Sequence, residues 1–432
     1  MGQSQKRKEI EMNRNIESYL NGVVLWRALL ALALGATSAS AQPSPSRPGP
    51  YAGLYQGAGK GRLTGHHQAP SATAVRAVHR QHPGYTMIPI DLVPGKTQIT
   101  PNDLNSKGQV VGTAFDDWGV DGVGYLFSER GTQVLPGIPP AFYILPFCIN
   151  DRNQIVGQAY FGDPTDITFG GWFWKPGLKE LARLSPLRDA DGWVSGSGIN
   201  HAGQIVGLSG TPTPFQCDAV MWESYKAQPT QLKGLPGAPI TDAWIINDNR
   251  PPQIAGWAFL DSFWGHSQAL FWRQPDAAPE VLPGLGGDGD QATSINDNQQ
   301  IAGYCATDPD DPSGSLHAVL WEHGKLTELA PDYEYSQASA NTHAINNAGQ
   351  IVGSAVMGDG ASHAVLWARC GHEIEMIDLN DHLTQPTNYL LNYADGINDD
   401  GCIIVDAYDV NDPTQLNRAF LLVPDHRTNA PR

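Results

Sequence analysis

Basic residues are scarce in most of this sequence. Beyond residue 84, only 17 Lys and Arg residues stand against 41 Asp and Glu residues, which gives a formal net charge of −24. A domain with this charge repels phosphate backbones and anionic lipid headgroups, so we expect no nucleic acid among its partners. Neutral sugars, cations and basic peptides are all compatible with the charge.

Cysteine is also rare. No two Cys residues have the close spacing of a structural zinc site, and their odd number leaves at least one of them outside any disulfide. We interpret them as small apolar core residues, with one disulfide as the alternative. The five are Cys148, Cys217, Cys305, Cys370 and Cys402.

Long apolar runs are missing after the N-terminus. One short run, 28–34, follows five basic residues and precedes a stretch of small residues. This order predicts a signal peptide over 1–41 that is cleaved after Ala41, and therefore a secreted or periplasmic protein. Either Met1 or Met12 can be the true start. An uncleaved anchor is the alternative, but the run is too short to span a bilayer, and no other stretch is long enough.

Residues 42–84 differ in composition from the rest of the chain. They are rich in Pro, Gly, Ser and Ala, and contain five basic residues and no acidic one. Such a segment buries too little apolar surface to offset the entropy lost on ordering, so we expect a flexible tail. The folded domain is predicted to span 85–432.

What the chain does contain is a repeat. The phrase Ile-Asn-Asn-Ala-Gly-Gln-Ile-Val-Gly runs from Ile345 to Gly353, and its variants follow one another at spacings of 45, 50, 47, 49, 50 and 52 residues. This period indicates a single repeat architecture. The repeated Asn residues are Asn105, Asn150, Asn200, Asn247, Asn296, Asn346 and Asn398.

Each repeat contains four segments with the pattern of strands. Examples are 280–282 for segment a, 292–296 for segment b, 204–207 for segment c and 317–321 for segment d. The Asn, Asp and Gly residues between b and c favour a hairpin, because Asn and Asp bond their own backbone and Gly adopts positive φ. We therefore interpret the repeated Asn residues as turn-forming and not catalytic.

Seven repeats of four short, weakly charged strands predict an all-β fold, a seven-bladed β-propeller with four antiparallel strands per blade. An open solenoid is the alternative, but it needs polar capping repeats, which the sequence lacks. The array begins with an a segment, 86–92, and ends with a d segment, 419–422. Because short links join d to a elsewhere, we expect these two segments to pair and close the ring.

Two segments, 317–321 and 363–367, both read His-Ala-Val-Leu-Trp, and 284–287 reads Gly-Leu-Gly-Gly. With the Ile-Asn phrase they resemble the repeat of a bacterial extracellular family that is named for its His-Ala-Phe tripeptide. The resemblance covers 86–424 and implies an exported, propeller-like protein, without implying an established reaction. Several repeats depart from it: Asp218, Gln268 or Arg418 stands in place of the His, and the first copy, 124–127, reads Gly-Tyr-Leu-Phe.

The strand order predicts two different faces. The short d–a and b–c connections lie on one face, and the long a–b and c–d connections lie on the other, where loops of this kind commonly carry binding sites. Aromatic rings beside carboxylates suit a sugar ring, while packing of the aromatics under their own loops is the alternative. The candidate ligand-binding residues are Trp118, Trp193, Trp244, Trp257, Trp264, Asp116 and Asp117.

An acidic cluster on the same face offers a second kind of site. Asp308, Asp310 and Asp311 could supply the oxygen ligands that calcium prefers, although a full calcium-loop motif is missing. Solvated turns are the alternative. No other cofactor is expected.

These features favour an exported, non-catalytic β-propeller that binds a carbohydrate or another surface ligand. One alternative is a polysaccharide lyase or glycosidase with carboxylates near the central channel, and another is a protein–protein scaffold. Two buried Asp side chains that face each other across the channel mouth would favour the enzyme. A flat aromatic platform would favour sugar binding.

Overall fold

The computed structural model describes residues 82–116, 121–162, 168–212, 215–260, 266–308, 316–331, 336–338, 344–371 and 373–425. Within these residues the regular structure consists of strands and one short 3-10 helix, η1 (Leu379–His382). No described helix has the length and apolar character needed to cross a membrane. The predicted signal peptide and most of the predicted tail lie outside the described residues.

The described strands form three four-stranded and two eight-stranded sheets, and we group them in fours by the sequence repeats, numbered I to VII. Repeats I to III contain β2 (Gln98–Leu104), β3 (Val110–Phe115), β4 (Gly122–Ser128) and β5 (Gly131–Val134); β6 (Tyr143–Ile149), β7 (Ile155–Phe161), β8 (Thr168–Trp174) and β9 (Ala182–Arg183); and β10 (Trp193–Ile199), β11 (Ile205–Pro212), β12 (Phe215–Trp222) and β13 (Thr230–Gln231). Repeats IV and V contain β14 (Ile240–Ile246), β15 (Ile254–Phe259), β16 (Ser267–Trp272) and β17 (Glu280–Val281); and β18 (Gln291–Ile295), β19 (Ile301–Ala306), β20 (Leu316–Glu322) and β21 (Lys325–Glu328). Repeats VI and VII contain β22 (Ser336–Ala338), β23 (Ile351–Val356), β24 (Ser362–Cys370) and β25 (Glu373–Asp378); and β26 (Tyr389–Ile397), β27 (Ile403–Asp409), β28 (Arg418–Pro424) and β1 (Tyr85–Pro89).

Strand β1 supplies the outer strand of the last unit. It pairs antiparallel with β28, with Thr86 opposite Val423 and Pro89 opposite Phe420. The backbone N–H of Ile90 continues the ladder to the carbonyl oxygen of Ala419 at 3.0 Å. The predicted pairing of 86–92 with 419–422 is therefore confirmed.

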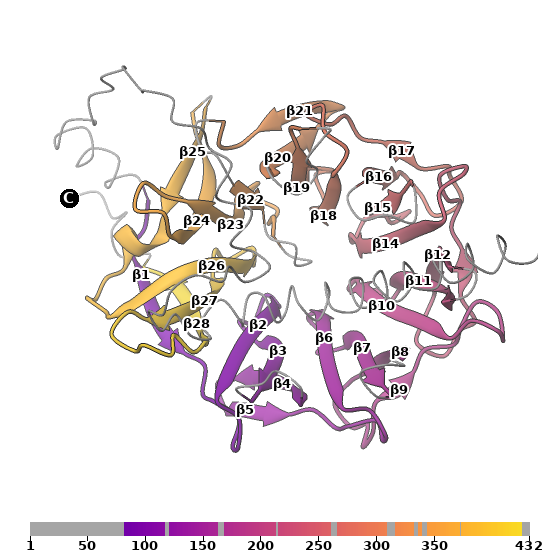
Figure 1. Ribbon diagram of the computed structural model, residues 1–432, viewed down its shortest axis with the longest axis horizontal. Helices are drawn as coiled ribbons and strands as arrows, with labels where there is room; N and C mark the ends of the chain where they lie inside the picture. The colour runs from indigo at the N-terminus through magenta and orange to yellow at the C-terminus, as the bar shows by residue number, and fades with distance from the viewer. Residues whose placement is uncertain are drawn as a thin grey trace, which may run out of the picture.

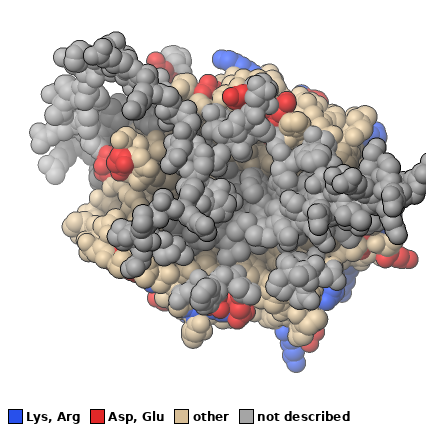
Figure 2. All heavy atoms as spheres, in the orientation of Figure 1, with Lys and Arg blue, Asp and Glu red and all other residues tan. Residues whose placement is uncertain are grey.

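The units surround a central space, with strands β2, β6, β10, β14, β18, β22 and β26 nearest to it (Figure 1). These are the predicted b segments, and those whose side chains are described are almost entirely buried. The sheets bury their faces against their neighbours, so the fold is an all-β propeller. In the view of Figure 2, the described charged side chains lie mainly toward the periphery.

A register shift recurs in the innermost strands. In six repeats the pairing slips three residues before the repeated Asn, as it does around Trp244 between Ala243 and Ile245. The Gly of the Gln-Ile-Val-Gly phrase faces this bulge. A Cβ on Gly256 would lie 2.0 Å from the carbonyl oxygen of Asp242, so this position requires glycine.

Tryptophan residues at the ends of the d segments connect neighbouring repeats. The indole N–H of Trp222 donates to the carbonyl oxygen of Ser185 at 2.9 Å, and that of Trp321 donates to Pro283 at 2.7 Å. Both acceptors follow the outermost strand of the preceding repeat. The five Cys residues form no disulfide, and Cys148, Cys217 and Cys305 are buried, which agrees with their predicted core role.

Candidate functional site

The turns between the b and c segments meet at one end of the central space. They line a cavity of about 120 Å³, to which every repeat contributes an apolar residue, the repeated Asn and the residue that follows it. We refer to this region as the channel mouth. All seven repeats contribute equivalent side chains to it.

Each repeated Asn first closes the turn of its own repeat. The Oδ1 atom of Asn346 accepts the backbone N–H groups of Ala348 at 3.1 Å and Gln350 at 2.9 Å. Gly349, inside the turn, has a φ of +75°. The turn-forming role that the sequence predicted is therefore confirmed.

Each repeated Asn also bonds the next repeat, which the sequence did not predict. Its Nδ2 atom donates to the backbone carbonyl oxygen of the following Asn, and all seven side chains are buried. The donor–acceptor pairs and distances are Asn105–Asn150 3.3 Å, Asn150–Asn200 2.8 Å, Asn200–Asn247 3.2 Å, Asn247–Asn296 3.1 Å, Asn296–Asn346 2.9 Å, Asn346–Asn398 3.0 Å and Asn398–Asn105 3.1 Å. These bonds form a cycle, which we call the asparagine cycle.

The residues that follow the Asn make a second set of bonds between repeats. Asp151, for example, accepts the backbone N–H of Ser106 at 2.9 Å, and Asp248 accepts that of His201 at 2.7 Å. Equivalent bonds join repeats IV to V, V to VI and VI to VII, at 2.9, 2.9 and 2.8 Å. The carboxylates at the mouth are therefore engaged in holding neighbouring repeats together.

His201 is the basic member of this set. Its Nε2 atom lies 2.9 Å from Oδ2 of Asp151, and its Nδ1 atom contacts Oδ2 of Asp248. The hydrogen bond to Asp248 and the charges of both carboxylates outweigh partial burial and raise the pKa of His201 to about 9. At neutral pH an imidazolium therefore bridges repeats II, III and IV.

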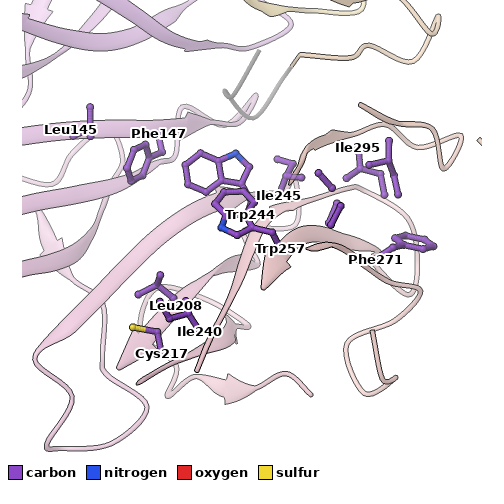
Figure 3. Close-up of a cluster of buried hydrophobic side chains, with 14 of the residues drawn as sticks. Leu145, Phe147, Leu208, Cys217, Ile240, Trp244, Ile245, Trp257, Phe271 and Ile295 are labelled. Carbon is purple, nitrogen blue, oxygen red and sulfur yellow. The ribbon is translucent and has the colours of Figure 1, made fainter. Parts of the chain in front are cut away.

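Three of the candidate sugar-binding Trp residues lie in the hydrophobic core, away from the channel mouth. Trp193 is 1% exposed, and Trp244 and Trp257 are each 6% exposed, within one hydrophobic cluster. Trp244 packs against Phe147 with ring centroids 5.4 Å apart and against Trp257 at 5.0 Å (Figure 3). These three Trp side chains thus pack beneath the surface, as the alternative interpretation expected, and do not form an exposed platform.

Of the other candidate site residues, the structure describes two, Asp116 and Asp308. Asp116 is half-buried. The pKa of Tyr143 is raised first by burial and then by the charges of Tyr160 and Asp116. Asp308 is exposed. The described residues contain no group of three or more His, Cys, Asp or Glu side chains placed to hold a metal ion. The remaining candidates lie outside the described residues: Asp117, Trp118, Trp264, Asp310 and Asp311.

Within the described part of the chain, no two buried Asp side chains face each other across the channel mouth. Asp151, Asp248 and Asp297 are half-buried and Asp399 is exposed. Each accepts a backbone N–H of the preceding repeat. Among the described residues, the two buried carboxyls that lie together are Asp395 and Asp406, on neighbouring strands of repeat VII.

The bonds between repeats at the channel mouth have a sequence signal, which appears at one repeat position and not in the overall composition. The residue after the repeated Asn is Asp or Asn in five of seven repeats: Asp151, Asp248, Asp297, Asn347 and Asp399. An acceptor at this position is what the bonds between repeats require. Alignment of the repeats on their Asn residues would have indicated it.

A scan against protein-family models found no match, and a search of curated proteins also found none. Membership of the His-Ala-Phe repeat family therefore stays a prediction. Among solved structures, the chain is similar to the β-propeller domain of the Trilobed protease from Pyrococcus furiosus, with 11% identity, a TM-score of 0.47 and coverage of 78% of this chain and 100% of that chain.

Two further solved structures show similar values. For the acylaminoacyl peptidase of Pyrococcus horikoshii, identity is 11% and the TM-score 0.45, over 77% of this chain and 52% of the peptidase, so the chain spans about half of that enzyme. For TolB from Acinetobacter baumannii, identity is 11% and the TM-score 0.36, over 71% of this chain and 76% of TolB. These likenesses concern the fold and carry no functional conclusion.

Proposed function

We propose that the chain is an exported, non-catalytic binding module, built as a closed seven-bladed β-propeller of the His-Ala-Phe repeat type. The observation that carries this proposal is the asparagine cycle, in which seven equivalent residues each bond the next and the seventh bonds the first. The β1–β28 pairing supports the same closure. A rigid ring of this kind is a platform for loops and not itself a reaction centre.

The proposed binding surface is the face opposite the channel mouth. At the mouth, the repeated polar groups are engaged by neighbouring repeats, so they have little capacity left for a ligand. The a–b and c–d connections of the opposite face differ from repeat to repeat, and they contain Trp118 and Trp264. A carbohydrate is the ligand class that we propose there, because aromatic rings stack on sugar faces while carboxylates accept their hydroxyl hydrogens.

Binding of the secreted protein to a glycan array tests this proposal. We expect selective binding that Trp118→Ala and Trp264→Ala each weaken without lowering the melting temperature. Lys325→Ala, an exposed substitution on the d–a hairpin of repeat V, is the matched control and should leave binding unchanged. Trp257→Ala is unsuitable, because that side chain is buried and its loss would destabilise the fold.

Three outcomes would contradict the proposal. Release of shorter oligosaccharides from a bound polysaccharide would identify a hydrolase or lyase. Silence on the array, together with capture of a defined surface protein, would identify a protein scaffold. A secreted product whose N-terminal residue is not Gln42 or close to it would contradict the predicted export signal.

A further inference from the structure

A pair of carboxyls is buried where the last repeat packs against the first. Asp406 lies on β27 and is 0% exposed, and Asp395 lies on β26 and is 1% exposed. Asp406 pairs with Tyr393 in the ladder, while Asp395 is the extra residue of the bulge between Ala394 and Gly396. The bulge therefore places a second carboxyl beside Asp406, in a sheet that packs against β2 of repeat I.

Neither oxygen of Asp406 has a hydrogen-bond partner. Burying an ionised carboxylate without a partner costs several kcal/mol, and burying a neutral carboxyl costs much less. Tyr125 on β4 of repeat I interacts electrostatically with both carboxyls, and its hydroxyl donates to the carbonyl oxygen of Thr100 at 3.1 Å. That hydroxyl is engaged within repeat I, so it does not stabilise a charge on Asp406.

The electrostatics agree with this geometry. Burial, followed by the charge of Asp395, raises the pKa of Asp406 well above its ordinary value. Burial, followed by the charges of Asp406 and Asp395, also raises the pKa of Tyr125. Two carboxyls in one buried site cannot both ionise at low cost, so a single proton is the simplest occupant of the pair.

One bond at the channel mouth is also absent from this junction, as it is from the junction of repeats II and III. Asp399 and Ser106 occupy the equivalent positions of repeats VII and I, but Ser106 lacks the Asp or Asn side-chain oxygen that in five repeats accepts the backbone N–H of the preceding repeat. A groove of about 1110 Å³ also opens here, lined by Lys107 of repeat I and by Asp400, Leu421 and Val423 of repeat VII among others.

We propose that Asp406 and Asp395 hold one proton between them and that this proton keeps repeats VII and I packed together. The pair then carries one negative charge, and loss of the proton places a second negative charge beside it in the junction. We call the pair a pH-sensitive latch. As the pH rises, the packing between the first and last repeats weakens, while the packing at the other junctions stays unchanged.

The direction of the pH effect follows from linkage. A carboxyl that holds its proton more tightly in the folded state than in the unfolded state binds more protons when folded. Stability is therefore greatest at acid pH and falls as the pH rises above the ordinary carboxyl range toward the raised pKa of the pair.

Thermal unfolding of the full chain between pH 4 and 9 tests the latch. In Asp406→Asn the charge is removed at constant size, so we expect a flatter pH profile and a melting temperature about 2–4 °C above wild type at pH 8. Asp395→Asn should flatten the profile in the same way, because either substitution removes the pair. Hydrogen exchange of β28 and β2 in wild type should rise with pH more than exchange of β14, after correction for intrinsic rates.

The matched control is Asp103→Asn at the junction of repeats I and II. Asp103 is equally buried, but its Oδ2 atom accepts the backbone N–H of Ile149 at 2.7 Å. This variant should lower the melting temperature without flattening the profile. Identical profiles for wild type and both asparagine variants at the pair would overturn the proposal. Stabilisation of wild type by added calcium, absent in Asp406→Asn and reversed by a chelator, would instead assign the pair to a cation.

Discussion

Asn398 donates a hydrogen bond from its side-chain nitrogen to the backbone carbonyl oxygen of Asn105, 3.1 Å away, although 293 residues separate them in the chain. The six other bonds of the asparagine cycle span one repeat each, between 45 and 52 residues. One residue type at one position therefore makes both the local turn and the contact between repeats.

Loss of a single member of the cycle should be costly. In Asn247→Ala, the backbone N–H of Gln253 loses its acceptor at 2.8 Å, and the carbonyl oxygen of Asn296 loses its donor at 3.1 Å. The carbonyl oxygen of Asn296 still accepts the backbone N–H of Gln299 at 3.3 Å, so one buried group is left without a partner, at a cost of roughly 2 kcal/mol of unfolding free energy. Urea unfolding measures the loss. Asn388→Ala, at an exposed position, should change it by less than about 0.5 kcal/mol.

The glycine that faces the bulge should tolerate no side chain. In Gly256→Ala, the new Cβ would meet the carbonyl oxygen of Asp242 at 2.0 Å, so the two inner strands must separate. We expect a loss of about 3 kcal/mol or more, measured by chemical unfolding. Gly137→Ala is the control, because a Cβ there has no neighbour within 4 Å. Equal stability of the two variants would refute the steric argument.

The imidazolium at the channel mouth should make stability depend on pH above neutrality. Because hydrogen bonding to Asp248 raises the pKa of His201 from 6.5 to about 9, its contribution is complete below pH 6.5 and is lost as the pH rises through 9. The side chain is 51% exposed, so solvent limits this contribution to roughly 1 kcal/mol or less. His201→Gln should lack this component of the pH profile. A profile unchanged by the substitution would show that the bridge adds no net stability.

The histidine of the His-Ala-Val-Leu-Trp segments should act as a cross-strand clamp. Nδ1 of His363 lies 2.6 Å from Asp378 on the outer strand, and His317 makes the same contact with Glu328 at 2.6 Å. Burial lowers the pKa of His363, but the hydrogen bonds and charges of Asp378 and Asp359 outweigh this effect and raise it. A double-mutant cycle of His363→Gln and Asp378→Asn should give a coupling of roughly 1 kcal/mol. Additive effects would mean that the pair contributes nothing beyond its packing.

Much of the fold could be predicted because the signals are local. The Asn and Gly residues of each turn act within a few residues, and the apolar a and d segments indicated that 86–92 pairs with 419–422. The choice of innermost strand could not be predicted, because the b and c segments are both buried throughout and their compositions do not distinguish them. Contacts between repeats depend on the spatial path of the ring, which no single repeat encodes.

The candidate site was harder to predict for a related reason. Trp193, Trp244 and Trp257 fall where the strand pattern ends or is interrupted, so they resemble loop residues in the sequence. The bulge around Trp244 keeps that residue within a buried strand, where it packs on Phe147 from repeat II. An alternating sequence pattern does not reveal a one-residue slip in strand pairing. At Trp244 this slip decides whether the side chain packs in the core or is exposed on a binding surface.

The register of β1 against β28 also sets the mechanical behaviour of the chain. Tyr85 lies opposite Pro424, so the flanking segments leave the ladder from the same end. A force that pulls these segments apart would load the hydrogen bonds one after another, as in unzipping, and not all at once, as in shear. A load applied to the chain through its two flanks would therefore separate the β1–β28 pair by unzipping.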